Sequence, residues 1–144
     1  MPDLYRIAST FRTAIEEAVR CGEIKETATF PYGCCGFASD LLQRFLFEKH
    51  IFTWYVSGRY GYGWSGESHA WLETRDGTVV DITGDQYKHK KPCFNEPVYV
   101  GERSDGFHDQ FDLDPPVAYQ FGDNPIEWDQ DFDCRYRLVM RHME

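Results

Sequence analysis

The stretch that decides the fold runs from residue 68 to residue 83 and reads Ser68-His69-Ala70-Trp71-Leu72-Glu73-Thr74-Arg75-Asp76-Gly77-Thr78-Val79-Val80-Asp81-Ile82-Thr83. Its two halves read as strands, and its centre, Arg75-Asp76-Gly77, is typical of a three-residue hairpin loop with glycine in the left-handed position. A loop of this kind pairs Thr74 with Thr78. The stretch therefore predicts an antiparallel hairpin of strands 68–74 and 78–83.

The register of this hairpin decides which of its side chains meet, because side chains alternate between the two faces of a strand. The predicted loop sets Trp71 opposite Asp81 and His69 opposite Thr83. Asp81 is then the diagonal neighbour of His69 on the same face, within side-chain reach. A two-residue turn would shift the register by one and send Asp81 to the other face. The predicted contact between His69 and Asp81 therefore depends on the type of turn that joins the two strands.

A second informative stretch lies upstream and reads Gly33-Cys34-Cys35-Gly36-Phe37-Ala38-Ser39. A thiol at the start of a helix can have its pKa lowered by the backbone N–H groups there. An imidazole can take the proton of such a thiol, and a carboxylate can orient the imidazole. We therefore identify Cys35, His69 and Asp81 as candidate catalytic residues, with Cys34 as the alternative nucleophile. The alternative interpretation makes both cysteines small buried hydrophobic residues.

Hydrophobic periodicity predicts the remaining elements. We expect amphipathic helices over 3–21 and 35–50, strands over 51–56 and 98–100, and a terminal helix that begins near Asn124-Pro125 and ends near residue 142. Residues 58–66 form a predicted glycine-rich loop. Aromatic residues of this loop and of its surroundings are candidates for a substrate groove or for a cover over the edge of the core: Tyr32, Tyr60, Tyr62, Trp64 and Trp71.

The segment of residues 102–133 differs in composition from the rest of the chain, because it contains ten acidic residues and Arg103 as the one lysine or arginine. Its six aromatic residues argue against a disordered acidic tail, so we expect an irregular wrap over 101–144 that aromatic side chains hold in place. His108 stands among these acids and is expected at the surface, with a role in a second site as the alternative.

Bulk composition limits the class of protein. The 144 residues suit one domain, and the net charge of -9 argues against a nucleic-acid partner and against an anionic membrane surface. Five cysteines are an odd number, and the first six residues lack the plan of a signal peptide, so we expect thiols in a cytoplasmic protein. No cysteine pair has the spacing of a zinc ribbon, and we expect no metal and no cofactor.

At residues 30–87 the chain resembles papain-like cysteine enzymes in their transglutaminase-like branch. The resemblance rests on Gly33-x-Cys35, on His69-Ala70-Trp71-Leu72-Glu73 and on Val80-Asp81-Ile82-Thr83. It implies Cys35 as nucleophile, His69 as general base and Asp81 as the residue that orients it. The stretch Cys34-Cys35-Gly36-Phe37 also resembles NlpC/P60 peptidases, which would make Cys34 the nucleophile.

One feature of papain-type enzymes is missing from the sequence. These enzymes carry a glutamine several residues before the cysteine, where this chain has Lys25-Glu26-Thr27-Ala28-Thr29. Donors for an oxyanion would then have to come from the Cys35 backbone N–H and from Tyr32 or a loop group.

Taken together, these patterns predict a single α+β domain in which the nucleophile helix packs on a small antiparallel sheet. The expected function is thiol-dependent acyl transfer on a peptide or protein substrate, or on a small amide or ester. Peptidases, amidases, deamidases and transglutaminase-like transferases all remain open. Two alternatives come from other classes: a catalytically silent protein-binding module on this fold, and a small metal- or redox-handling protein.

Overall fold

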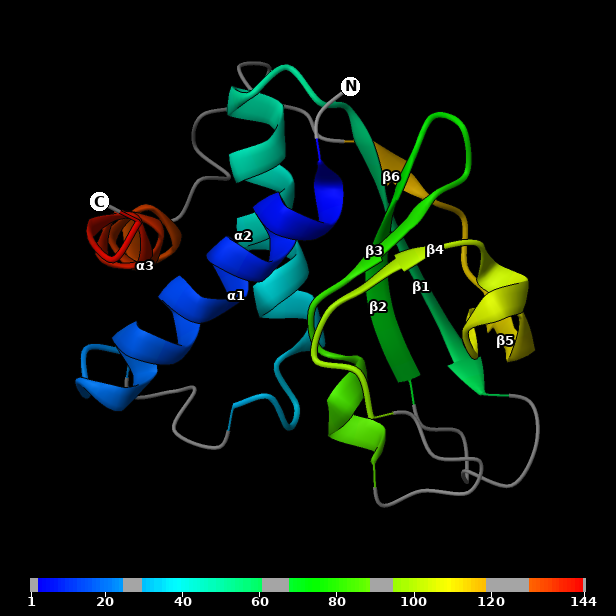
Figure 1. Ribbon diagram of the computed structural model, residues 1–144, viewed down its shortest axis with the longest axis horizontal. Coiled ribbons are helices and arrows are strands. Elements are labelled where there is room, and N and C mark those ends of the chain that lie inside the picture. Colours follow the sequence, from blue (N-terminus) through cyan, green and yellow to red (C-terminus); the bar gives the residue numbers. More distant parts are fainter. Residues whose placement is uncertain (1–2, 25–29, 61–67, 89–94, 119–129, 144) are drawn as a thin grey trace.

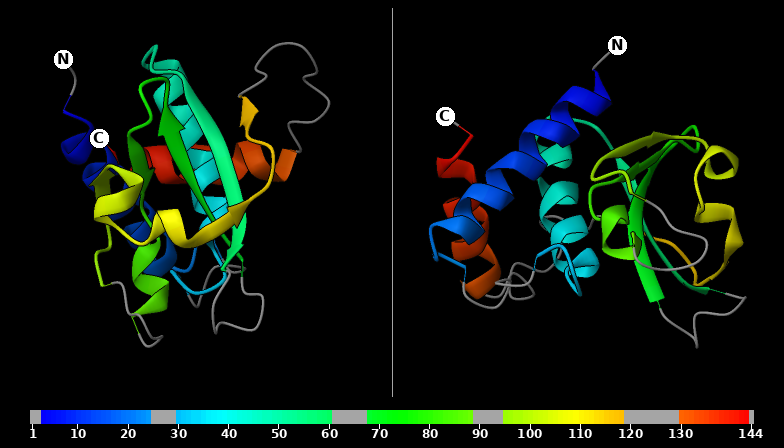
Figure 2. Two further views of the ribbon diagram at one scale, coloured as in Figure 1. Left: turned by 90° about the vertical axis from the view of Figure 1, so that its right-hand side faces the viewer. Right: turned by 60° about the horizontal axis from the view of Figure 1, so that its bottom comes forward.

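The computed structural model describes residues 3–24, 30–60, 68–88, 95–118 and 130–143. Within these ranges the chain forms three α-helices and six strands, which confirms the α+β class. The helices are α1 (Leu4–Arg20), α2 (Cys35–Glu48) and α3 (Gln130–Arg141). All three lie on one side of the sheet, while the segment that leads to β5 lies on the other (Figure 1, Figure 2). None of the described helices is long and apolar enough to cross a membrane.

The sheet is antiparallel and has the strand order β4-β3-β2-β1-β5, with β6 also pairing with β1. Its central strands are β1 (Thr53–Tyr60) and β2 (Ser68–Thr74), and β3 (Val79–Asp81) follows β2 through the predicted hairpin. The remaining strands are short: β4 (Tyr99–Gly101), β5 (Phe111–Leu113) and β6 (Val117–Ala118).

The hairpin has the register that its loop predicts. Leu72 pairs with Val80, and the Thr74 N–H donates to the Thr78 carbonyl at 2.9 Å. Gly77 has a φ of 87°, the left-handed conformation that glycine adopts without strain. His69 and Asp81 therefore share a face of the sheet.

The two faces of the sheet carry separate hydrophobic cores. Leu72 and Val80 face the helices and pack with side chains of α1 and α2, among them Phe11, Leu41 and Leu46. The alternate residues Trp71 and Val79 point to the opposite face, into a second cluster completed by Val56, Tyr60, Tyr87, Tyr99, Phe107 and Phe111. Two short 3₁₀ turns, η3 (Arg103–Asp105) and η4 (His108–Gln110), cover this second face.

Two expectations need correction, and a third is confirmed in part. Strand β1 runs to Tyr60, so its last three residues are strand rather than glycine-rich loop. The segment after residue 101 is less irregular than expected, because β5 and β6 add to β1. The terminal helix α3 ends close to the predicted point, while its predicted start at Asn124-Pro125 lies outside the described residues.

Candidate active site

Cys35 is the first residue of α2, and the loop before it prepares this position. Gly33 has a φ of 72°, which is rarely open to residues with a side chain, and Cys34 is the N-cap residue. Burial acts to raise the pKa of the Cys35 thiol. Hydrogen bonding and charge from His69 outweigh burial, so the pKa of Cys35 lies below its ordinary value.

Cys34 has a different environment from its neighbour. Its side chain is buried, its thiol donates to the Tyr32 carbonyl at 3.3 Å, and burial raises its pKa. Cys35 rather than Cys34 therefore has the more acidic thiol and the contact with His69. All cysteines in the described part of the chain are free thiols.

His69 and Asp81 form the predicted contact. The His69 Nε2 lies 2.7 Å from Asp81 Oδ2, and both residues are only 1% exposed. Burial acts to lower the pKa of His69, but the charge of Asp81 and its hydrogen bond outweigh it and raise this pKa to about 9. Burial acts to raise the pKa of Asp81, and the charge of His69 and the hydrogen bonds of His69 and His108 hold it well below its usual range.

His108 is expected from the sequence at the surface, with a second site as the alternative, and no sequence pattern connects it with Asp81. The His108 Nε2 lies 2.7 Å from the same Asp81 Oδ2, and its side chain is 0% exposed, so the expected surface position is wrong. The ring packs between Trp71 and Tyr99 beside Phe107, with the His108 and Phe107 ring centroids 4.7 Å apart. The one sequence signal was its place between aromatic residues in Phe107-His108-Asp109-Gln110-Phe111.

Glu73 on β2 binds the segment that carries His108 and holds it against the sheet. Its carboxylate accepts two hydrogen bonds from Arg103, at 2.6 and 2.8 Å, and one from the Trp71 indole at 2.9 Å. Arg103 precedes η4, so this bidentate pair holds the short 3₁₀ turns against the sheet. The glutamate of the His69–Glu73 stretch thus has a structural role in placing His108 near Asp81.

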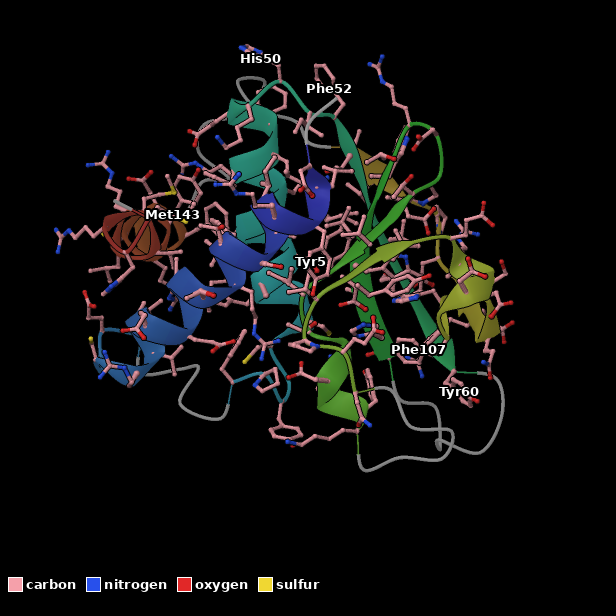
Figure 3. The ribbon with its side chains drawn as sticks, in the orientation of Figure 1. Tyr5, His50, Phe52, Tyr60, Phe107 and Met143 are labelled. Carbon is pink, nitrogen blue, oxygen red and sulfur yellow. The ribbon has the colours of Figure 1, made fainter. Side chains whose placement is uncertain are left out.

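The candidate groove residues are found in three situations. Tyr32 is 41% exposed in the turn that leads to Cys35. Tyr60 and Trp71 are buried in the second core, and the Tyr60 hydroxyl donates to Gln110 at 2.8 Å, so both cover or fill the core rather than line a surface. Figure 3 shows Tyr60 and Phe107 together on the side of the sheet away from α1. Tyr62 and Trp64 lie outside the described residues.

The buried group His69, Asp81 and His108 has the residue types of a metal site. Both Nε2 atoms lie 2.7 Å from one carboxylate oxygen, which is the length of a charge-assisted hydrogen bond. A metal ion would need the lone pairs of these nitrogens and ligand distances of about 2.0–2.2 Å from a point between them. The geometry therefore favours proton-bearing nitrogens that donate to Asp81 over a metal centre.

Searches of protein-family models, curated proteins and solved structures find no match for this chain. The site itself brings a carboxylate, an imidazole and a thiol into series, with His69 only 1% exposed. Such a series can hold a thiolate, store its proton on the ring and return that proton to a leaving group.

Proposed function

We propose that this protein is a thiol-dependent acyl-transfer enzyme with Cys35 as nucleophile, His69 as general base and acid, and Asp81 as the residue that orients His69. The observation that carries the proposal is the series of Asp81, His69 and Cys35: Asp81 binds the buried His69 at 2.7 Å, and hydrogen bonding and charge from His69 lower the pKa of the Cys35 thiol. A chain of this kind is the arrangement that activates a thiol for attack on a carbonyl.

The roles of the two imidazole nitrogens follow from their contacts. Nε2 is engaged by Asp81, so Nδ1, which also lies 2.9 Å from the Gln86 side-chain amide, is the ring nitrogen that can take the Cys35 proton. The proton of Cys35 moves to Nδ1, the thiolate attacks the carbonyl carbon of an amide or ester, and a tetrahedral oxyanion forms. Its collapse breaks the bond to the leaving group, which takes the proton from Nδ1, and a thioester remains on Cys35.

Water or an amine then releases the acyl group from Cys35. Water would make the protein a peptidase, amidase, deamidase or esterase, and an amine would make it a transferase. Support for a core of the papain-like, transglutaminase-like type comes from the chain order of cysteine helix, histidine strand and aspartate strand, with α2 packed against the sheet. We therefore expect a peptide, a protein or a small amide or ester as substrate.

Trapping of the acyl-enzyme tests this function. The wild-type protein is mixed with p-nitrophenyl acetate, the release of p-nitrophenolate is followed, and the acetylated peptide is identified by mass spectrometry. We expect a burst close to one equivalent with the acetyl group on Cys35, and loss of the burst in Cys35→Ala. A protein without a burst, or one whose burst survives in Cys35→Ala, would not be an enzyme of this kind and would favour the binding-module alternative.

A further inference from the structure

Gln86 places a side-chain amide near Cys35, although it is not one of the three proposed catalytic residues. It lies in the 3₁₀ turn η2 (Gly84–Tyr87), which follows β3. Its Nε2 lies 2.9 Å from His69 Nδ1, and its Oε1 accepts the Gly33 N–H at 3.2 Å. Hydrogen bonding by this amide also acts to lower the pKa of the Cys35 thiol. The amide therefore joins the loop before α2 to the imidazole, beside the nucleophile.

The contact with Gly33 fixes which way the amide points. A backbone N–H only donates, so the atom that it reaches must be the amide oxygen. The NH₂ group of Gln86 consequently faces Cys35 and His69. The donor is placed by backbone geometry, since Gly33 carries the positive φ that shapes this loop.

The protonation state of His69 decides what this donor can bind. In the neutral pair, His69 Nδ1 is an acceptor and takes the Gln86 N–H. Once Nδ1 has received the thiol proton, two N–H groups would face each other, so the Gln86 N–H must find another acceptor. The nearest negative charge is then on the Cys35 sulfur, and during attack it moves onto the carbonyl oxygen.

We propose that Gln86 is a further catalytic residue, whose side-chain N–H binds the oxyanion together with the backbone N–H of Cys35. In this step the sulfur–carbon bond forms, the carbonyl π pair moves onto oxygen, and the proton stays on His69 Nδ1. As the first residue of α2, Cys35 has a backbone N–H without a partner inside its own helix. The inference rests on the proposed acyl transfer and supplies a glutamine amide, which the sequence of residues 25–29 does not contain.

Two reactions of the Cys35 thiol distinguish oxyanion binding by Gln86 from a role in which Gln86 only positions Cys35 or His69. Iodoacetamide alkylates a thiolate by displacing iodide at a CH₂ group, and no oxyanion forms. Acetylation by p-nitrophenyl acetate passes through an oxyanion, and its phenolate leaves without needing a proton from His69. Both rates are measured across pH on wild type, Gln86→Met and Gln86→Ala, and are compared on the plateau where Cys35 is thiolate. Gln110→Ala, which removes an amide that binds the Tyr60 hydroxyl instead of His69, is the matched control.

We expect both Gln86 variants to be acetylated about 10²–10³-fold more slowly than wild type, with plateau alkylation changed less than about threefold. Gln110→Ala should match wild type in both reactions. If Gln86→Met slows both reactions equally, or neither, Gln86 is not an oxyanion donor, although the acyl-transfer function stands. If wild type itself is alkylated quickly but never acetylated, the acyl-transfer function fails and the role of Gln86 fails with it.

Discussion

At the scale of single residues, Asp81 is the centre of the site because three N–H groups converge on its carboxylate. Oδ2 accepts from His69 and His108, both at 2.7 Å, and Oδ1 accepts from the Thr83 N–H at 2.9 Å. A buried carboxylate with three donors is stable only as the anion, which agrees with the depressed pKa of Asp81. The anion in turn raises the pKa of His69 and keeps a proton on its ring.

Asp81→Asn tests this arrangement. The amide can still accept from Thr83, but its NH₂ group then faces the imidazole N–H donors. We expect the Cys35 pKa to rise, with neutral-pH alkylation falling about tenfold per pKa unit, and the free energy of unfolding to fall by about 1–3 kcal/mol. Thiol labelling and urea denaturation are measured side by side, with exposed Asp109→Asn as control. Labelling at the wild-type rate would make Asp81 a purely structural acceptor.

The stability gap between wild type and Asp81→Asn should also depend on pH. The raised pKa of His69 stabilises the fold fully at pH values below about 6.5, the pKa of histidine in the unfolded chain. This stabilisation is lost as the pH rises through the pKa of His69 in the folded protein, about 9. The lowered Asp81 pKa stabilises the fold above about pH 4, and this part is lost on acidification. The gap should therefore be largest near pH 5–7 and shrink towards pH 10 and towards pH 3. A gap that does not vary with pH would contradict the ion pair.

His108→Phe tests the second donor to Asp81. Phenylalanine keeps the ring contacts with Trp71 and Tyr99 but removes one N–H donor from the carboxylate. We expect a loss of about 1.5–3 kcal/mol in the free energy of unfolding and a smaller shift in the alkylation pH profile than Asp81→Asn causes. His142→Phe, which removes a partly buried imidazole that pairs with Glu23 instead of Asp81, serves as control. An unchanged urea midpoint would show that His108 does not support Asp81.

At the scale of elements, the hairpin shows how much of the site a local pattern predicts. The Arg75-Asp76-Gly77 loop predicts the observed register, and with it the His69–Asp81 contact. The helix that begins at Cys35 is predicted equally well from hydrophobic spacing. These features depend on residues that are close in sequence, and this is why the sequence alone predicts them.

The contacts that the sequence did not predict are between distant segments. His108 reaches Asp81 because Arg103 binds Glu73 and because β5 pairs with the end of β1. Gln86 reaches Cys35 because η2 turns back beneath the loop at Gly33. No periodicity marks such contacts, since they join separate segments of the chain, such as Glu73 with Arg103 and Gly33 with Gln86.

Gly77→Val, compared with Gly77→Asn, tests whether the loop conformation holds this hairpin. Apart from its chain neighbours, no atom of the described residues lies within 4 Å of a Cβ built on Gly77, so the cost of a side chain arises from its φ of 87° rather than from a clash. Asparagine tolerates the left-handed region, whereas a β-branched residue does not. We expect valine to cost at least about 1 kcal/mol more than asparagine in urea denaturation. Equal stabilities would contradict the assigned turn.

At the scale of the whole molecule, Arg12 joins the helical layer to the edge of the sheet. Its guanidinium makes two hydrogen bonds of 2.9 Å with the Asp85 carboxylate and also donates to the carbonyls of Ile82 and Pro97. Asp85 precedes Gln86 in η2, so α1 supports the turn that reaches the nucleophile. The arginine is only 7% exposed, although its position in the sequence resembles an ordinary polar face of a helix.

Arg12→Met should therefore be far more costly than Arg20→Met on the same helix. Removing Arg12 leaves Asp85 and two carbonyls without their donor, which we expect to cost about 3–5 kcal/mol in the free energy of unfolding. Arg20 forms an exposed pair with Glu17, whose loss should leave the free energy of unfolding nearly unchanged. Urea denaturation of both variants measures the difference. Similar losses would show that Arg12 does not clamp the two layers.

The pH dependence of Cys35 alkylation tests the central claim most directly, namely that Cys35 shares its proton with a His69 held by Asp81. Wild type, Cys34→Ala and Cys35→Ala are treated with limiting iodoacetamide from about pH 4 to pH 10, and the labelled residue is mapped by mass spectrometry. We predict rapid labelling of Cys35 that persists well below the ordinary thiol pKa of about 8.5, is retained in Cys34→Ala and is lost in Cys35→Ala. Rapid labelling of Cys34, or a Cys35 profile with an ordinary midpoint near 8.5, would contradict the account.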